Sequence, residues 1–219
     1  MFISPFNVVL FDLDGTLVDT APDLGYALNT LLEKEGHQPL DHARIRPVAS
    51  HGSAGLLKLG FGIEKEDPVY PALQQRFLSL YAENIARESA LFIGMQQVLE
   101  SLAANDIRWG VVTNKPSFLT IPLMEALQLT ESAACIVSAD TTPYSKPHPA
   151  PMLHACELLD AKPVDCIYIG DAERDIQAAH NAQMRSVVAL YGYISETDDP
   201  ESWQADCLIN HPHEILQWI

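Results

Sequence analysis

Short apolar runs rich in β-branched residues recur along this chain, and segments with helical spacing lie between them. The runs are continuous, which is typical of strands buried on both faces of a parallel sheet. They lie at Val8–Phe11, Trp109–Val112, Ala134–Val137, Cys166–Ile169, Ser186–Leu190 and, more weakly, Cys207–Ile209. The helical segments cover about 94–104, 119–127, 149–159 and 174–182. This alternation predicts an α/β fold, a doubly wound and mostly parallel sheet with helices on both faces.

Residues from about 17 to 91 break this alternation. Helical patterns follow one another there with no comparable strand between them, over residues 23–35, 53–59 and 71–86. We therefore expect a small helical cap, residues 17–91, inserted directly after the first strand. The α/β core would then be discontinuous, made of residues 1–16 and 92–219.

The composition limits the classes of partner. The 219 residues are 47% hydrophobic, enough for a sizeable core, and only 19% are charged, which argues against a disordered chain. Asp and Glu number 29 against 13 Lys and Arg, so the formal net charge is −16. An acidic surface of this kind excludes nucleic acid and anionic membrane surfaces as partners.

The residues of this sequence show no pattern typical of a targeting segment or of a redox site. No apolar run reaches the roughly 18 residues of a spanning helix, and the segment Met1–Asn7 has no basic stretch or cleavage pattern. We therefore expect a cytoplasmic protein. Its four cysteines lie far apart without a Cys-x-x-Cys pair, so they are expected to be buried, reduced and unconnected to zinc.

Polar residues collect at the carboxyl ends of the predicted strands, where ligands bind in open parallel sheets. They are Asp12 and Asp14, Thr113 with Asn114, Lys146, and Asp171 with Asp175. Four carboxylates at one edge repel one another unless a cation balances them, and a hard oxygen-ligated ion such as Mg²⁺ does so well. A lone aspartate at a strand end is more often a turn or helix cap, but capping does not explain the ordered set with its lysine. The set predicts phosphate chemistry with Mg²⁺.

These residues resemble a known family. Asp12-Leu13-Asp14-Gly15-Thr16, Thr113 after an apolar strand, Lys146 before a proline, and Gly170-Asp171-x-x-x-Asp175 are similar, in order, to the four motifs of the haloacid dehalogenase superfamily of phosphohydrolases. The resemblance spans nearly the whole chain and implies a Rossmann-like core. A helical insertion after the first motif resembles the cap of the phosphoglycolate phosphatase and β-phosphoglucomutase branch.

The resemblance also implies roles. Asp12 would be the nucleophile that forms an aspartyl-phosphate, and Asp14 the general acid and then the general base. Thr113 and Lys146 would bind the phosphoryl group, with the backbone N–H groups of Leu13 and Asn114 completing the cradle. An acid at position 14 favours an oxygen leaving group over a halide.

The same resemblance implies the metal ligands. Asp12, the carbonyl of Asp14 and Asp171 would hold Mg²⁺, while Asp175 would contact it directly or through water. The remaining negative charge would be offset by backbone dipoles and a proton on Asp14.

Substrate choice is expected to lie in the cap. Arg46 and His51 belong to a polar stretch between helices, so both are candidate substrate contacts. A solvated helix end is an equal interpretation for Arg46. His51 has no partner at metal-ligand spacing, so it fits a loop or substrate contact better than a ligand.

Finer resemblance narrows the substrate to two small phosphorylated metabolites. Trp109–Pro116 fits phosphoglycolate phosphatases and N-acetylmuramic acid 6-phosphate phosphatases alike, whereas Tyr191–Ile194 and Ile45-Arg46 look closer to the second group. The expected substrate is N-acetylmuramic acid 6-phosphate or 2-phosphoglycolate. One departure is Gln183, where relatives carry glycine, and it leaves the end of the preceding helix open.

Two other functions stay as alternatives. The first is a sugar phosphomutase of the β-phosphoglucomutase type, whose cap would return the phosphate to a sugar. The second, less favoured, is a phospho-accepting signalling domain, which would lack both the helical insertion and the acid at position 14. The sequence leaves open whether the protein is a monomer or a homodimer.

Overall fold

A computed structural model describes residues 6–218, and its centre is a six-stranded sheet with the strand order β5-β4-β1-β6-β7-β8. All five neighbouring pairs are parallel. The strands are β1 (Val8–Phe11), β4 (Arg108–Val112), β5 (Cys135–Val137), β6 (Cys166–Gly170), β7 (Arg185–Ala189) and β8 (Cys207–Ile209). The predicted doubly wound α/β fold is confirmed, and every predicted strand is present within one residue of its expected bounds.

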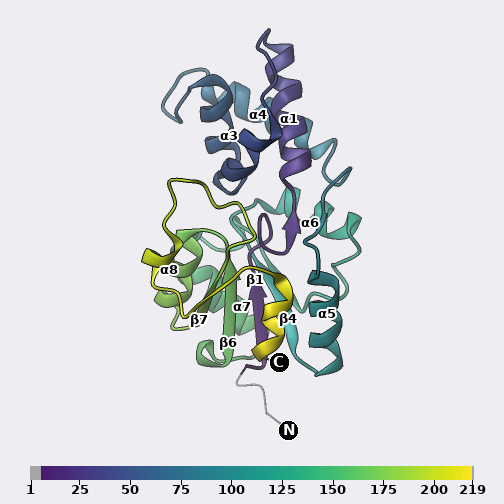
Figure 1. The fold of residues 1–219 in the computed structure, drawn as a ribbon, viewed down its shortest axis with the longest axis vertical. Coiled ribbons are helices and arrows are strands. Elements are labelled where there is room, and N and C mark those ends of the chain that lie inside the picture. Colours follow the sequence, from purple (N-terminus) through teal and green to yellow (C-terminus); the bar gives the residue numbers. More distant parts are fainter. Residues whose placement is uncertain (1–5, 219) are drawn as a thin grey trace.

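Helices cover both faces of this sheet (Figure 1). They are α5 (Met95–Ala104), α6 (Ser117–Ala126), α7 (Ala150–Leu158) and α8 (Glu173–Asn181), with short 3₁₀ turns η2 (Pro163–Asp165), η3 (Pro200–Trp203) and η4 (Pro212–Trp218). Alternate side chains of β1 enter separate apolar clusters: Val9 and Phe11 pack with α5 and α6, whereas Val8 and Leu10 pack with α7 and α8. This alternation explains why the strands read as continuous apolar runs.

A second group of helices stands beyond the end of the sheet to which β1 points (Figure 1). These are α1 (Ala21–Lys34), α2 (His42–Ile45), the 3₁₀ turn η1 (Arg46–His51), α3 (Gly52–Phe61) and α4 (Tyr70–Ala82). Their apolar side chains, among them Leu28, Ile45, Leu56 and Phe77, form one cluster, to which the core contributes Leu119 and Tyr193. We propose residues 17–91 as a cap on this basis, since most of this cluster is distinct from the two clusters that pack on the sheet.

A pair of very short strands, missed by the sequence analysis, joins cap and core. Strand β2 (Val18–Asp19) pairs antiparallel with β3 (Ala90–Leu91). Two residues are too few to show a period, so no sequence pattern marked them. Behind this pair, the buried carboxylate of Asp23 accepts hydrogen bonds from the backbone N–H groups of Glu88 and Ser89 and from Ser89 Oγ. The two chain crossings between core and cap are thus tied together.

Several smaller predictions can be compared with the structure. Cys135, Cys156 and Cys166 are buried free thiols, as expected, while Cys207 is only partly buried. Gln183 takes a left-handed φ of 62° just beyond α8, which is the backbone conformation that favours glycine there. No helix within residues 6–218 has the length and apolarity to cross a bilayer. Residues 1–5, on which the expectation of an untargeted start partly depends, lie outside the described residues.

Candidate active site

The loop after β1 is shaped by close backbone approach. The N–H of Asp12 extends the sheet ladder by donating to the carbonyl of Ile169, and the N–H of Leu13 donates to Asp12 Oδ1 at 2.8 Å. Gly15 has a φ of +86°, and a Cβ there would lie 2.0 Å from Asp171 Oδ2. Glycine is therefore required at this position, and it allows the loop to bring Asp12 and Asp171 together.

Lys146 joins the predicted nucleophile to the last motif. Its buried Nζ lies 2.9 Å from Asp12 Oδ1 and 2.7 Å from Asp175 Oδ1. The same ammonium donates to the carbonyl of Val112 at 3.0 Å and to Tyr168 Oη at 2.8 Å. A buried ammonium needs such partners to offset its desolvation, and here two of them are carboxylates.

The loop that carries Lys146 is held by Asn114. The Asn114 side chain donates to the carbonyl of Lys146 and accepts from its N–H, each at 2.9 Å. The neighbouring Thr113 is buried, and its N–H donates to the carbonyl of Val137 across the β4–β5 pair. The structure thus brings Thr113, Asn114 and Lys146 to one edge of the sheet.

Burial and neighbouring charges separate the pKa values of the three buried aspartates. Burial alone would raise the pKa of Asp12, but Lys146, Arg174 and the hydrogen bonds to Asp12 outweigh it and hold that pKa below its ordinary value. Burial, reinforced by the charges of Asp12 and Asp175, raises the pKa of Asp171 to about 7. Burial also raises the pKa of Asp175, although Lys146 opposes it. Of these three aspartates, Asp12 is therefore the one whose ionised form is most strongly favoured.

These three residues fit a divalent cation. One carboxylate oxygen each from Asp12, Asp171 and Asp175 lies within 4.8 Å of the others. Asp171 Oδ1 is buried and has no hydrogen-bond partner among residues 6–218. An all-oxygen set with an unpartnered buried carboxylate oxygen suits a hard ion. The side chain of Asp14 lies outside this group, and its assignment to the metal through its carbonyl stays a prediction.

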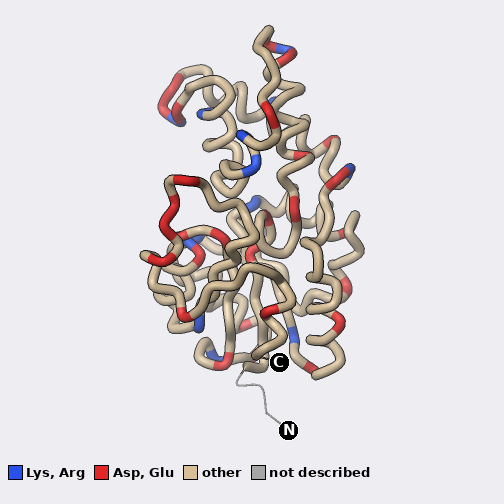
Figure 2. Tube along the Cα trace, viewed as in Figure 1, with Lys and Arg blue, Asp and Glu red and all other residues tan. Residues whose placement is uncertain are grey.

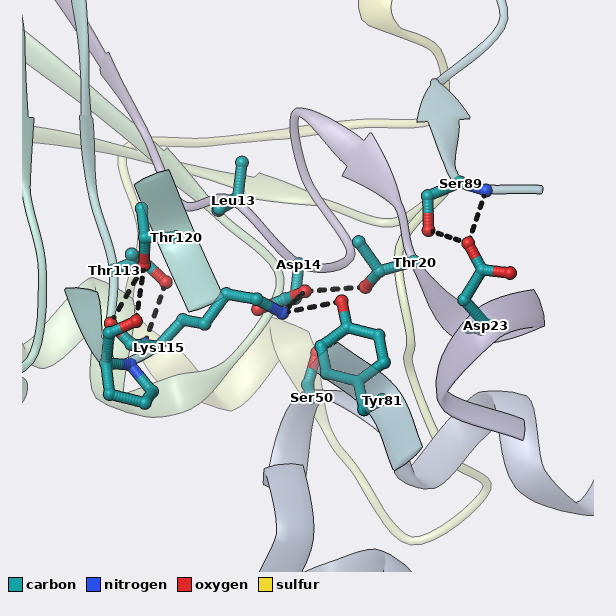
Figure 3. Close-up of polar contacts among 12 residues, drawn as sticks. Leu13, Asp14, Thr20, Asp23, Ser50, Tyr81, Ser89, Thr113, Lys115 and Thr120 are labelled. Carbon is teal, nitrogen blue, oxygen red and sulfur yellow. Dashed lines mark hydrogen bonds and ion pairs between the residues drawn. The ribbon is translucent and has the colours of Figure 1, made fainter. Parts of the chain in front are cut away.

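A cavity of about 590 Å³ opens between core and cap. Its core side includes Asp12, Asp14, Thr113, Asn114, Lys115 and Arg174, and its cap side includes Ser50, His51, Ser53, Tyr70, Gln74 and Phe77. Figure 3 shows part of this region, with Tyr81 of the cap reaching Lys115 beside Asp14. The reactive groups therefore lie on the core side of a cavity, and residues of the cap form its opposite wall.

The two cap residues predicted to contact the substrate have different surroundings in the structure. His51 lines the cavity. Arg46 instead forms a salt bridge with Asp19, with Nη1 2.8 Å from each carboxylate oxygen, and its guanidinium lies 5.1 Å from the centre of the Tyr193 ring. Arg46 thus docks the cap on the β2–β3 region, and the structure does not bring it to the cavity.

Three functional candidates escaped the sequence analysis. Lys115 and Arg174 are cations that line the cavity beside the carboxylates. With Lys146, three basic side chains therefore face four carboxylates. Tyr193, which the sequence analysis named only within the stretch Tyr191–Ile194, donates from its N–H to Asp171 Oδ2 and accepts through its hydroxyl from the N–H groups of Thr20 and Ala21. The available signal was their place in the segments that follow β4, β6 and β7.

The chain is similar to known proteins over most of its length. Residues 9–189 match the family of haloacid dehalogenase-like hydrolases. The chain belongs to this family. A phosphoglycolate phosphatase of Xylella fastidiosa is 42% identical over 207 residues, which cover 94% of this chain and 90% of the relative. The predicted superfamily and its phosphoglycolate phosphatase-like branch are confirmed.

Two further relatives support the same placement. An N-acetylmuramic acid 6-phosphate phosphatase of Pseudomonas putida is 38% identical over 213 residues, covering 97% of this chain and 96% of that protein. A crystal structure described as a predicted phosphoglycolate phosphatase from Haemophilus somnus superposes with a TM-score of 0.84, at 27% identity and 99% coverage of both chains. The prediction of a phosphoric monoester hydrolase of this superfamily is confirmed.

Proposed function

We propose that the protein hydrolyses a small phosphate monoester through an aspartyl-phosphate on Asp12, with Mg²⁺. One observation carries the proposal: the Asp12 carboxylate lines the cavity while Lys146 holds its pKa low, so an ionised nucleophile faces the substrate space. Asp14 lines the same cavity, where it can serve the leaving oxygen. A nucleophile beside a separate acid–base group is the arrangement that two-step ester hydrolysis requires.

In the first step, a carboxylate oxygen of Asp12 attacks phosphorus, the bond from phosphorus to the ester oxygen breaks, and Asp14 gives that oxygen its proton. In the second step, water attacks the phosphorus, Asp14 takes a proton from it, and the bond to Asp12 breaks to release phosphate. Thr113 would donate to a phosphoryl oxygen. Lys146 would offset the charge that develops on the phosphoryl group and on Asp12.

The metal site follows from the carboxylate set described above. Asp12 and Asp171, with the carbonyl of Asp14, would hold Mg²⁺, and Asp175 would act directly or through water. When bound, the ion would neutralise charge on the phosphoryl oxygens. Within this set, Lys146 already pairs with both Asp12 and Asp175, whereas Asp171 has no contact with it.

The nucleophile is tested by Asp12→Asn. Turnover of p-nitrophenyl phosphate with Mg²⁺ should fall by about a thousandfold or more, because an amide cannot form the covalent intermediate. The matched control is Asp160→Asn, an exposed aspartate in a left-handed backbone position that asparagine tolerates. Full activity of Asp12→Asn would overturn the proposed function.

The cavity supports the larger of the two expected substrates. At about 590 Å³ it lies within the roughly 300–1,000 Å³ of sites for drug-sized ligands, which is more room than a two-carbon acid phosphate fills. Its cap wall offers polar groups, His51, Ser53 and Gln74, suited to hydroxyl and amide groups of a sugar. We therefore favour N-acetylmuramic acid 6-phosphate over 2-phosphoglycolate.

A phosphate-release comparison of these two compounds tests the choice. We expect kcat/KM to be higher for N-acetylmuramic acid 6-phosphate, and a strong preference for 2-phosphoglycolate would reverse it. An isomerised sugar phosphate formed without free phosphate would instead indicate the phosphomutase alternative. Cytoplasmic location, and whether the protein is a monomer or a homodimer, stay predictions.

A further inference from the structure

Lys115 is a buried lysine for which the two-step mechanism has no role. It follows Thr113 and Asn114 at the end of β4, and its side chain is 5% exposed. Its backbone is fixed within the core, since its N–H donates to Thr113 Oγ1 and its carbonyl accepts from Thr120 Oγ1 and from the N–H of Ala139. The core therefore fixes the backbone from which this ammonium extends.

The ammonium of Lys115 reaches one oxygen of Asp14. Lys115 Nζ lies 2.9 Å from Asp14 Oδ1, and Thr20 Oγ1 donates to the same oxygen at 2.6 Å (Figure 3). No donor among residues 6–218 contacts Asp14 Oδ2. Two hydrogen bonds on one oxygen restrict the rotation of a carboxylate and leave the other oxygen, on a residue that lines the cavity, available to a substrate.

The second contact of Lys115 comes from the cap. Tyr81, in the last turn of α4, is buried and accepts a hydrogen bond from Lys115 Nζ through its hydroxyl at 2.8 Å. The ammonium also lies 4.4 Å from the centre of the Tyr81 ring, where a cation is attracted to the aromatic face. Tyr81 lies on α4, within the proposed cap, so its hydroxyl reaches Lys115 only while the cap packs on the core.

We propose that Lys115 is a positioning residue that orients Asp14 toward the leaving oxygen, and that Tyr81 holds Lys115 in place when the cap is seated. The inference rests on the proposed function, because it assigns to Asp14 the proton transfer described above. It adds a physical link through which the cap completes the core site, by way of Tyr81, which lies 34 residues before Lys115 in the chain. Groups that must be aligned with a reacting atom lose rate when their support is removed.

The test uses two substrates that differ in their need for the proton. An alkyl phosphate requires protonation of its leaving oxygen, whereas p-nitrophenyl phosphate has a stabilised leaving group that requires little. The parameter compared is kcat/KM, because it reports the steps from substrate binding up to the departure of the leaving group. Lys115→Met should lower kcat/KM for N-acetylmuramic acid 6-phosphate about tenfold or more beyond its effect on p-nitrophenyl phosphate.

Tyr81→Phe removes only the hydroxyl. It should produce the same selective loss at smaller size, about threefold to tenfold, and the double variant should lose no more than Lys115→Met alone, because Tyr81 acts through Lys115. The matched controls are Tyr26→Phe on the exposed face of α1 and Lys162→Met on the core surface, both expected to keep wild-type kcat/KM for both compounds.

Each outcome decides the inference. Equal losses on both substrates, or losses of the two variants that multiply in the double variant, would overturn it. If Lys115→Met does not fold, the substrate selectivity of Tyr81→Phe alone decides. If Asp12→Asn is inactive while Lys115→Met and Tyr81→Phe keep full activity, only this inference fails. Retained activity of Asp12→Asn would instead overturn the proposed function beneath it.

Discussion

Asp171 shows at the scale of one residue how burial prepares a site for a cation. Its Oδ2 accepts hydrogen bonds from Ser50 Oγ at 2.6 Å and from the N–H of Tyr193 at 2.8 Å, while Oδ1 has no partner among the described residues. The low-polarity surroundings and the charges of Asp12 and Asp175 raise the pKa of Asp171 to about 7. Without a divalent cation, Asp171 therefore keeps a proton well above the pH at which a free aspartate loses it.

This pKa predicts how Mg²⁺ binding depends on pH. Because a carboxyl with a raised pKa must lose its proton before it binds a cation, protons compete with Mg²⁺ below about pH 7. We expect the increase in Tm caused by Mg²⁺ to grow from pH 5 to pH 7 and then to level off. Thermal unfolding with and without Mg²⁺ at each pH measures this.

Two variants sharpen the measurement. Asp171→Asn should abolish the Mg²⁺-dependent rise in Tm, while Asp160→Asn on the core surface should keep it. An increase in Tm that is the same from pH 5 to pH 8 would show that Asp171 does not hold the competing proton.

At the scale of elements, the junction between α1 and β3 depends on one buried carboxylate. Asp23 lies in the first turn of α1, where it also faces the positive end of the helix dipole. It accepts from the N–H groups of Glu88 and Ser89 and from Ser89 Oγ, at 2.7 to 3.2 Å. The chain that leaves the core and the chain that returns to it are thus joined beside the active site (Figure 3).

Removing this carboxylate should destabilise the protein measurably. Asp23→Ala leaves the buried N–H and hydroxyl of Ser89, and the N–H of Glu88, without an acceptor, so we expect a loss of about 2–3 kcal/mol in the free energy of unfolding. Urea unfolding measures the loss. Ser89→Ala removes only the hydroxyl contact and should cost about 1 kcal/mol. Equal stability of Asp23→Ala and wild type would show that the junction does not depend on Asp23.

At the scale of the whole molecule, the negative field and the local cations oppose each other. The net charge is −16, and Figure 2 shows Asp and Glu over both the core and the cap. Against this field, the cavity brings Lys115 and Arg174 beside the carboxylates, with Lys146 beneath. Interactions between surface charges are screened by salt, whereas those of buried groups are screened much less.

This difference predicts an unusual salt response. Screening should weaken the long-range repulsion of an anionic substrate more than the short-range attraction of the buried cations. We expect kcat/KM for p-nitrophenyl phosphate to rise about twofold as KCl increases from about 10 to about 150 mM at constant Mg²⁺. A steady fall over that range would show that cations at the entrance dominate the field that the substrate meets.

The sequence by itself determined the sheet and the places of the motif residues. Continuous apolar runs predict strands buried on both faces, and the carboxyl ends of parallel strands lie at the same edge of the sheet. Asp12, Thr113, Lys146 and Asp171 could therefore be predicted to meet without knowing any distance. The two-residue strands β2 and β3 could not, because so short a pairing has no period of its own.

Only the tertiary structure decided what the cap contributes. Arg46 reads in the sequence as a substrate contact or a solvated helix end, but in the folded protein it pairs with Asp19. Lys115 stands beside the motif residues in the sequence, yet its partners Asp14 and Tyr81 come from two other segments. Local periodicity records which face of an element is buried, not which distant side chain lies opposite, and that pairing is set by how the cap packs on the core.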